Sequence, residues 1–429
     1  MNRTRRDRAT LAAIVWAVLV SQVLLYPGVE DLVAVLGAGA DAGIDAGMWF
    51  LVAEFAAFVV CAGLWGAASD ALGRRVPLVV AGALGGAVGY LALVGVALAD
   101  LPFWVALLVR VLGGAMTIGA FSLGITMLMD LTGGHGRNMG AAGLAIGLGA
   151  ALGSVVGGRL TTLDPLAPVV GAAVLLFVVA LAAATVREGA VESAASDPAD
   201  DPVSESVDGS VGDDAAEPGM GDVLSGLGDR PELLVPYAFG FIDRLTAGFF
   251  ALVGVYYFRD VFGLSAAGAG GVLALFFVPF AVLQYPFGTL SDRVGRFAPV
   301  VVGSVLYGFA IVGVGIAPSL VPAAAMMVVV GVFGALVAPA TMALVTDVAA
   351  PEERGAAMGG FNVFGSLGFL TGFLVGGTAA STLGYLEAFL VVGAMEVGIA
   401  LLALRAVRRL APGGIARTSE TAAEPTEGS

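Results

Sequence analysis

The sequence predicts an all-α integral membrane protein with twelve transmembrane helices arranged as two similar halves. Hydrophobic residues make up 58% of the 429-residue chain and charged residues only 13%, and the mean hydropathy is +0.95. A helix that crosses the hydrocarbon layer needs roughly 20 apolar residues, and many runs here reach that length. A segment near residue 70 also recurs about 220 residues later, which indicates an internal repeat.

Twelve apolar runs are long enough to cross a bilayer, and a polar gap divides them into two sets of six. The first set lies at 11–36, 48–67, 76–98, 103–129, 139–160 and 166–186, and the second at 234–257, 267–289, 298–317, 321–345, 356–380 and 385–404. We therefore predict two pseudo-symmetric six-helix bundles, at residues 1–186 and 234–410. A linker at 187–233 joins them, and a tail at 411–429 follows.

The linker is strongly acidic. From Glu188 to Asp222 it holds eleven acidic residues and neither a basic nor an aromatic residue. Such a segment buries too little apolar surface to order itself, so we predict a disordered, solvated linker. The formal net charge is −14, and all 20 basic residues are arginine. Acidic, lysine-free polar parts resemble the proteins of extreme halophiles, and we expect a salt-loving archaeal source.

The distribution of arginine predicts the orientation in the membrane, because cytoplasmic loops retain positive charge during insertion. With the amino terminus inside, sixteen arginines fall on the cytoplasmic face. Arg159 and Arg259 fall outside, and Arg110 and Arg244 lie within spans. We therefore expect a multi-pass protein of the plasma membrane with both termini and the linker in the cytoplasm.

The composition excludes several classes of protein. A P-loop needs a lysine on the phosphates and a retinal Schiff base needs a lysine amine, so both are excluded. The single cysteine, Cys61, lies in an apolar run, and the single histidine, His135, lies in a glycine-rich loop. A metal site or a nucleophilic catalytic site needs more such residues together. We expect no enzymatic activity, no cofactor, no metal and no nucleic-acid partner.

One short motif occurs at matching places in both halves. Residues 66–75 read GAASDALGRR and residues 288–297 read GTLSDRVGRF, each directly after the second span of its half. The shared pattern, Gly-x-x-Ser-Asp-x-x-Gly-Arg, resembles the loop motif of the major facilitator superfamily. The resemblance covers nearly the whole chain and implies that superfamily's fold of two six-helix bundles.

The resemblance also implies a conformational gate on the cytoplasmic side. In the family, the motif aspartate caps a helix of the other half, where the helix dipole favours negative charge. We carry this role over to Asp70 and Asp292, with charges that only set topology as the alternative. We interpret two further pairs as inner-gate ion pairs, Asp130 with Arg137 and Asp347 with Arg354, in each of which the two residues are seven positions apart. The expected gate residues are Asp70, Arg74, Arg75, Asp130, Arg137, Asp292, Arg296, Asp347 and Arg354.

Glycines recur every four residues in the fifth and eleventh spans. They are Gly149, Gly153 and Gly157 in the fifth, and Gly368, Gly372 and Gly376 in the eleventh. Small residues at this spacing let helix backbones approach closely in lipid, and generic close packing is the plain interpretation. The first copy also resembles the fifth-helix motif of the superfamily's proton-coupled antiporters, although Ser154 stands where proline is usual.

Two charged residues inside the spans of the first half are candidates for proton coupling. The sequence Arg110-Val-Leu-Gly-Gly resembles the Arg-x-x-Gln-Gly pattern of the same antiporters, with the glutamine lost. An intramembrane arginine usually faces a polar cavity or a carboxylate, and Glu54 lies at a similar depth. We predict that Glu54 and Arg110 interact, and that Glu54 carries a proton under the control of Arg110. A fixed structural ion pair is the alternative.

The seventh span carries Asp243, the second candidate for a proton or cation site, with pairing to an adjacent helix as the alternative. Helix geometry turns neighbouring side chains about 100° apart, so Asp243 and Arg244 cannot both point squarely into a central cavity. The candidate residues of a substrate cavity between the halves are Gln22, Tyr26, Arg244, Gln284 and Tyr285. Glu396 is also intramembrane, and the sequence suggests no role for it.

The family resemblance implies a secondary transporter that alternates between inward-open and outward-open states. We expect a monomer in the lipid bilayer that takes a small-molecule substrate and uses protons, or else sodium, as the coupling ion. The partial antiporter motifs favour proton-driven efflux of an amphipathic compound. Uptake or facilitated exchange of a small solute, such as a sugar or an organic anion, is the alternative. A non-transporting membrane sensor or assembly partner, acting through its linker, is the alternative of another class.

Overall fold

The computed structural model consists of helices and short connections, without strands, over the residues that it describes. These are residues 3–39, 42–129, 135–186, 227–228, 230–350 and 353–410, with only the backbone described at 3–7, 129 and 135–144. Most of the predicted linker and the whole predicted tail lie outside the described residues. The predicted all-α class is confirmed.

The amino-terminal half begins with a broken span. It consists of α1 (Arg3–Val23), η1 (Tyr26–Gly28), α2 (Val29–Val33) and η2 (Ala34–Ala38). The break follows from Pro27, since proline has no backbone N–H to donate within a helix. The remaining spans of this half are α3 (Gly43–Leu72), α4 (Val76–Leu98), α5 (Phe103–Met129), α6 (His135–Thr161) and α7 (Ala167–Ala183).

The carboxy-terminal half repeats this plan. Its first span is again interrupted, by η5 (Phe250–Gly254), which follows η4 (Pro231–Leu233) and α10 (Leu234–Phe249) and precedes α11 (Val255–Asp260). The others are α12 (Ala266–Val294), η6 (Ala298–Val302) with α13 (Gly303–Gly315), α14 (Leu320–Val348), α15 (Arg354–Thr382) and α16 (Tyr385–Leu410). Within the described part of the chain, ten helical runs are long and apolar enough to cross a membrane, and two shorter apolar helices, Ala145–Thr161 and Ala167–Ala183, complete the predicted twelve.

The glycines of the repeated motif end the second span of each half. Gly73 closes α3 with a φ of 59°, and Gly295 closes α12 with a φ of 85°. Both lie in the left-handed region that glycine adopts without a steric penalty, and such glycines commonly end helices. The motif aspartates Asp70 and Asp292 therefore lie in the last turns of these helices.

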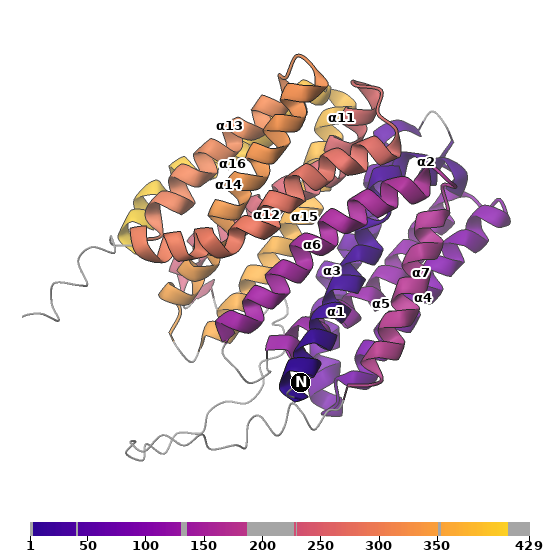
Figure 1. Cartoon of the computed structure of the whole chain (residues 1–429), viewed down its shortest axis with the longest axis horizontal. Helices are drawn as coiled ribbons and strands as arrows, with labels where there is room; N and C mark the ends of the chain where they lie inside the picture. The colour runs from indigo at the N-terminus through magenta and orange to yellow at the C-terminus, as the bar shows by residue number, and fades with distance from the viewer. Residues whose placement is uncertain are drawn as a thin grey trace, which may run out of the picture.

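The two halves lie side by side, with the helices roughly parallel to one another (Figure 1). The main contacts between halves are α6 against α12 and α3 against α15. We call the end where α1 begins and α16 ends the terminal end, and the opposite end, where α2 and α11 lie, the far end. These names are used below for both halves.

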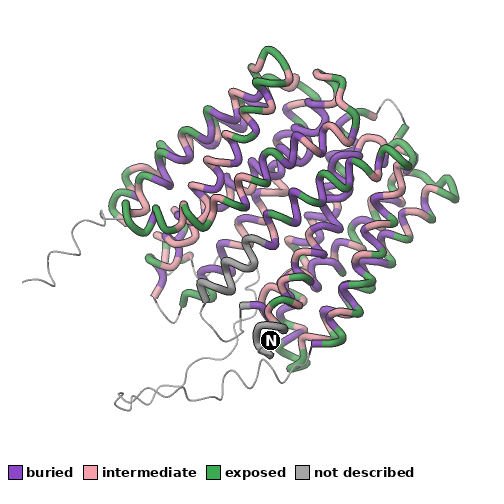
Figure 2. The backbone as a smooth tube through the Cα atoms, viewed as in Figure 1, coloured by how far each residue is buried: buried purple, intermediate pink, exposed green. Residues whose placement is uncertain are grey.

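Buried residues follow the sides of the helices that face one another, and exposed residues lie on the outside (Figure 2). On α5, the outward residues Trp104, Leu108 and Leu112 are all exposed, at helical spacing. A continuous apolar stripe of this kind on an outer face fits contact with lipid rather than water.

Predicted glycine faces pack helices together within each half. A Cβ atom at Gly157 would overlap the backbone of Leu24 in the first span, and one at Gly372 would overlap the backbone of Leu245 in α10. The glycines of α6 and α15 thus serve equivalent contacts with the first span of each half. Different glycines bring the halves together: Gly158 lies against Ala266, and Gly270 against the Ser154 carbonyl.

Candidate functional site

A buried ion pair joins α3 and α5 in the amino-terminal half. The Arg110 guanidinium donates through Nη2 to Oε2 of Glu54, and the two side chains are only 3% and 1% exposed. The structure brings these two predicted residues together. The proton-carrying role of Glu54 stays a prediction.

Aromatic rings and glycines surround this ion pair. The guanidinium carbon of Arg110 lies 4.5 Å from the Phe50 ring centre and 5.7 Å from that of Tyr90, distances typical of cation–π contacts. Tyr90 in turn donates to the Ser21 carbonyl at 3.2 Å. A small pocket beside the pair is lined by Glu54, Gly86, Gly89, Tyr90, Arg110, Gly113 and Thr117, among others. The pair therefore lies inside the bundle formed by α3, α4 and α5.

The Nε atom of Arg110 is buried and has no hydrogen-bond partner. A buried donor that is left unpaired destabilises a fold by about 1–3 kcal/mol. The ion pair is thus not fully satisfied in this conformation.

A second buried polar cluster lies in the carboxy-terminal half. Asp243 of α10 is 5% exposed and Glu396 of α16 is fully buried, and their charges interact. Thr246 donates to Oε2 of Glu396 at 3.2 Å, and Ser304 and Tyr307 of α13 are buried beside the two acids. The nearest base is Arg244, whose Nε lies 3.8 Å from Oδ2 of Asp243. The alternative for Asp243, pairing with an adjacent helix, is thus not observed as a salt bridge.

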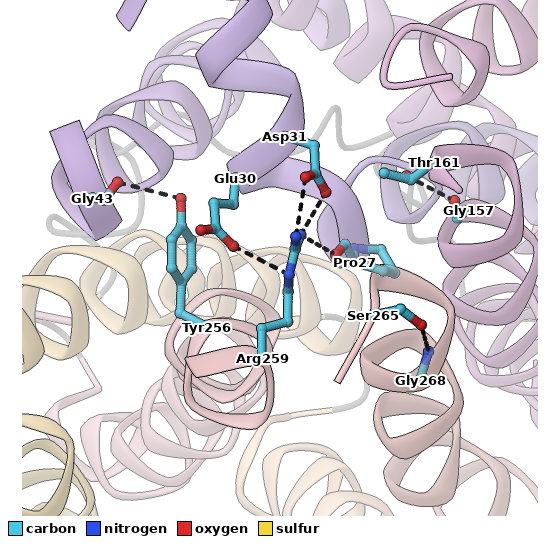
Figure 3. A network of polar contacts seen from close by, with 10 residues as sticks. All are labelled: Pro27, Glu30, Asp31, Gly43, Gly157, Thr161, Tyr256, Arg259, Ser265 and Gly268. Carbon is cyan, nitrogen blue, oxygen red and sulfur yellow. Dashed lines mark hydrogen bonds and ion pairs between the residues drawn. The ribbon is translucent and has the colours of Figure 1, made fainter. Parts of the chain in front are cut away.

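A network of ion pairs holds the two halves together at the far end (Figure 3). Arg259 of α11 donates from Nη1 and Nη2 to the two carboxylate oxygens of Asp31, at 2.6 and 3.0 Å. Its Nε lies 3.1 Å from Glu30, and Nη1 also donates to the Pro27 carbonyl at 3.4 Å. We call Arg259, Glu30 and Asp31 the far-end clamp. Nearby, Tyr256 donates to the Gly43 carbonyl at 3.4 Å, again from one half to the other.

Apolar contacts between the halves also lie toward the far end. Met48 of α3 lies against Gly377 of α15. The ring of Phe55, also on α3, stacks on the Phe369 ring with 5.2 Å between ring centres and meets the Phe373 ring edge-on with 5.1 Å between ring centres. Met48 and Gly377 lie toward the far ends of α3 and α15, and the three phenylalanines lie nearer the middle of these helices. On the terminal side, Tyr285 of α12 is 78% exposed. The conformation is therefore one in which contacts between the halves close the far end.

At the terminal end, one arginine ties two helices of the carboxy-terminal half together. Arg296 donates to Asp292 at 2.6 Å, to Asp347 at 3.0 Å and to Ser291 at 3.0 Å. Partial burial lowers the pKa of the Arg296 guanidinium, but the hydrogen bonds to Asp292 and Asp347 outweigh this effect and raise the pKa above its usual value. The arginine stays charged at any physiological pH.

The whole chain matches one protein family. The family described as Major Facilitator Superfamily matches residues 11–258 and 237–426, once for each half with a short overlap. The chain belongs to the Major Facilitator Superfamily. This MFS protein is accordingly a multi-pass membrane protein and a secondary transporter of small molecules, and not an enzyme. No curated protein sequence matches it.

Solved structures of transporters share the fold of this MFS protein. A bacterial homolog of the human lysosomal transporter Spinster, inward-facing and unoccupied, gives a TM-score of 0.75 at 16% identity, covering 96% of this chain and 98% of the other. The human organic anion transporter MFSD10 gives a TM-score of 0.62 at 21% identity, covering 95% of this chain and 100% of the other. A D-xylose-proton symporter gives a TM-score of 0.67 at 16% identity, covering 92% of this chain and 96% of the other. At these identities the likeness shows the fold alone.

The predicted gate residues of this MFS protein are only partly paired as expected. Asp347 contacts Arg296, whereas Arg354 donates through Nε to the Thr346 carbonyl at 3.2 Å, so the expected Asp347–Arg354 pair is not formed in this conformation. Asp292 pairs with Arg296 of its own half, and among the described residues no ion pair joins it to the other half.

In the amino-terminal half, Asp70 is exposed at the end of α3, and Arg74 and Arg75 lie between α3 and α4. Asp130 lies outside the described residues, and only the backbone of Arg137 is described. Their gate roles stay predictions.

The five candidate cavity residues do not share one environment. Tyr26 is buried and interacts electrostatically with Glu54 and Arg110, and Gln22 is buried with its Nε2 unpaired. Tyr285 is largely exposed on α12, next to the half-buried Gln284. Tyr26 and Tyr285 thus lie in different surroundings in this conformation, and the prediction that they line one cavity stays a prediction.

Sequence reasoning missed the far-end clamp and the role of Glu396. One signal was available for the clamp: the acidic pair Glu30–Asp31 and the base Arg259 lie near the same end of the first span of their respective halves, and opposite charges there favour an ion pair between the halves. For Glu396, no sequence signal pointed to its partners on α10 and α13.

Proposed function

We propose that this MFS protein exports a small amphipathic compound in exchange for protons. The observation that carries the proposal is the buried Glu54–Arg110 pair. Ionisable residues inside the membrane are expensive and are by default functional. While paired, the two charges neutralise each other. If a change of conformation drew Arg110 away, Glu54 would be a buried, uncompensated charge, which is strongly unfavourable, and it would bind a proton instead.

The contacts between the halves support alternating access. If the terminal end is cytoplasmic, as the arginine distribution predicts, the far-end clamp closes the external side and the conformation is inward-facing. Opening the external side would then require Arg259 to leave Glu30 and Asp31, as α3 and α6 move away from α15 and α12. Transporters of this kind rock one half against the other around a central site.

The choice of substrate and direction rests on the partial antiporter motifs. In α5 the motif supplies Arg110, and in α6 it supplies the glycine face that packs on the first span. Together they favour export of an amphipathic compound over uptake.

A second candidate function is uptake or exchange of a small polar or anionic solute. Arg244 favours it, because its side chain is 35% exposed while its neighbour Asp243 is buried. An accessible guanidinium can bind a carboxylate or phosphate through paired hydrogen bonds. Among the structural neighbours, MFSD10 is an organic anion transporter and another is a xylose–proton symporter.

The test is the lumenal pH of acid-loaded proteoliposomes, at high salt, while amphipathic cations, neutral drugs, sugars and organic acids are added in turn. Export by antiport predicts that one class of compound dissipates the proton gradient, and that Glu54→Gln abolishes this response. Glu387→Gln, at an exposed position on α16, is the control and should behave as the wild type. A response that survives Glu54→Gln would refute the role of Glu54. Binding of an organic anion that is lost in Arg244→Gln, without proton movement, would favour the second candidate.

A further inference from the structure

The buried cluster in the carboxy-terminal half contains two acids from different helices. Asp243 on α10 and Glu396 on α16 are 5% and 0% exposed, and the charge of Asp243 acts on the carboxyl group of Glu396. Gly308 lets α13 approach α16 closely beside Glu396, since a Cβ atom there would lie 2.7 Å from the Gly393 carbonyl and 3.3 Å from Cβ of Glu396. The three helices α10, α13 and α16 thus enclose the two carboxyl groups.

The charges in this cluster do not balance. From α10 the facing charged groups are Asp243 and Arg244, from α16 Glu396, and α13 contributes only the neutral Tyr307 and Ser304. Arg244 is 3.8 Å from Asp243 and partly exposed, so it compensates at most one of the two acids. One negative charge is left over in a buried site within the membrane-spanning region. A buried charge of this kind persists only when it is paired or neutralised.

Unsatisfied oxygen atoms gather in the same place. Oδ1 of Asp243, Oε1 of Glu396 and the Tyr307 hydroxyl are all buried and without a hydrogen-bond partner. Ser304 and Tyr307 are both fully buried, and Ser304 lies beside Glu396. Each unpaired buried oxygen is unfavourable, and native proteins contain few of them. Three in one cluster, two of them on carboxyl groups, indicate a ligand that accepts the lone pairs of oxygen atoms.

We propose that Asp243, Glu396, Thr246, Ser304 and Tyr307 form a binding site for one monovalent cation. The ligand is a cation because every unpaired atom is an oxygen and the surplus charge is negative. It is monovalent because that surplus is one charge, and because no group of three or more histidine, cysteine or acidic residues occurs among the described residues to hold a divalent metal. A proton on one of the two carboxyl groups and a bound sodium ion both meet this requirement.

This site is separate from the Glu54–Arg110 pair, which lies in the other half and is already neutral. The inference therefore does not depend on proton-coupled export. Binding can be measured on the purified protein without any flux, so that failure of one proposal leaves the other standing.

Two measurements on the full-length protein in detergent test the site. The first is the midpoint of thermal unfolding as sodium chloride replaces choline chloride at constant ionic strength. The second is the infrared absorption of protonated carboxyl groups during a pH titration. The variants are Glu396→Gln and Asp243→Asn, which keep the side-chain shape and remove one charge, and Glu387→Gln on the same helix is the control.

If sodium is the ligand, the wild type and Glu387→Gln gain a saturable rise in midpoint with sodium, and either cluster variant loses at least tenfold in apparent sodium affinity. If a proton is the ligand, sodium has no specific effect, and the wild type shows a protonated-carboxyl band that both cluster variants lose. Should Glu396→Gln not fold, Asp243→Asn decides. A wild type with neither the sodium-dependent rise nor a carboxyl band removed by these variants would overturn the proposal.

Discussion

The far-end clamp makes a quantitative prediction about the conformational equilibrium. Replacing Arg259 with glutamine removes the paired hydrogen bonds to Asp31 and the contact with Glu30. In this conformation Arg259 is 15% exposed, whereas Asp31 and Glu30 are 35% and 41% exposed. All these contacts join the two halves, so they exist only while the far end is closed.

The magnitude follows from this partial exposure. Hydrogen bonds to charged groups contribute about 1.5–3 kcal/mol when shielded, whereas exposed ion pairs contribute about 0–1 kcal/mol. For a bidentate pair with a mostly buried arginine and partly exposed acids, we expect about 1–2 kcal/mol. Arg259→Gln should therefore raise the ratio of far-end-open to far-end-closed molecules about 5- to 30-fold. Salt should reduce the effect, because the acids are partly accessible to ions.

Distances between spin labels measure this ratio. Labels at Leu163 and Leu383, exposed far-end positions in opposite halves, report the separation of the halves in a Cys61→Ser background. Arg159→Gln, an exposed arginine at the far end of α6, is the matched control and should leave the distribution unchanged. The charge swap Arg259→Asp with Asp31→Arg should restore part of the closed population. An unchanged distribution in Arg259→Gln would show that the clamp does not hold the halves together.

Three further predictions concern packing and charge. Gly157→Ala should destabilise the fold by about 1–3 kcal/mol, because the added methyl group would overlap the Leu24 backbone. The control Gly398→Ala, at a position with open space, should leave the stability unchanged. Thermal unfolding compares the two variants, and equal unfolding midpoints would refute the packing argument. Arg110→Ala should lower the free energy of unfolding by about 3–5 kcal/mol, because it leaves Glu54 buried and unpaired, and adding Glu54→Gln should recover much of that loss. A double-mutant cycle that shows no coupling between the two positions would contradict this prediction. Arg296→Gln should lower the free energy of unfolding by at most about 1 kcal/mol, since the side chains of Asp292 and Asp347 are 63% and 50% exposed. A larger loss of stability in denaturant titrations would contradict this prediction.

Most of the fold follows from the sequence, because hydropathy alone marks the spans. The predicted runs 76–98 and 103–129 coincide with α4 and α5. Others were predicted too short: α3 continues to Leu72 and α12 to Val294, since polar residues of the motif still form the last helical turns. The break of the first span at Pro27 was not predicted, because the apolar run continues through it.

The site was harder to predict, because its contacts join residues far apart in the sequence. Depth in the membrane was enough to match Glu54 with Arg110, which are 56 positions apart in neighbouring helices of one half. Arg259 and Asp31 are 228 positions apart, and their contact depends on how one half sits on the other. Glu396 meets Thr246 across 150 positions, and nothing in the spacing of the two residues predicts that their helices are in contact. The glycine spacing likewise predicted close packing but could not name the partner helix.

The central claim is that protons and substrate move in opposite directions through this MFS protein. The most direct measurement records both in the same proteoliposomes, with a pH-sensitive dye in the lumen and a labelled compound that the protein transports. The account predicts that substrate leaving the lumen is matched by protons entering, and that Glu54→Gln uncouples the two. Substrate and protons moving in the same direction, or substrate moving with no proton flux in the wild type, would contradict it.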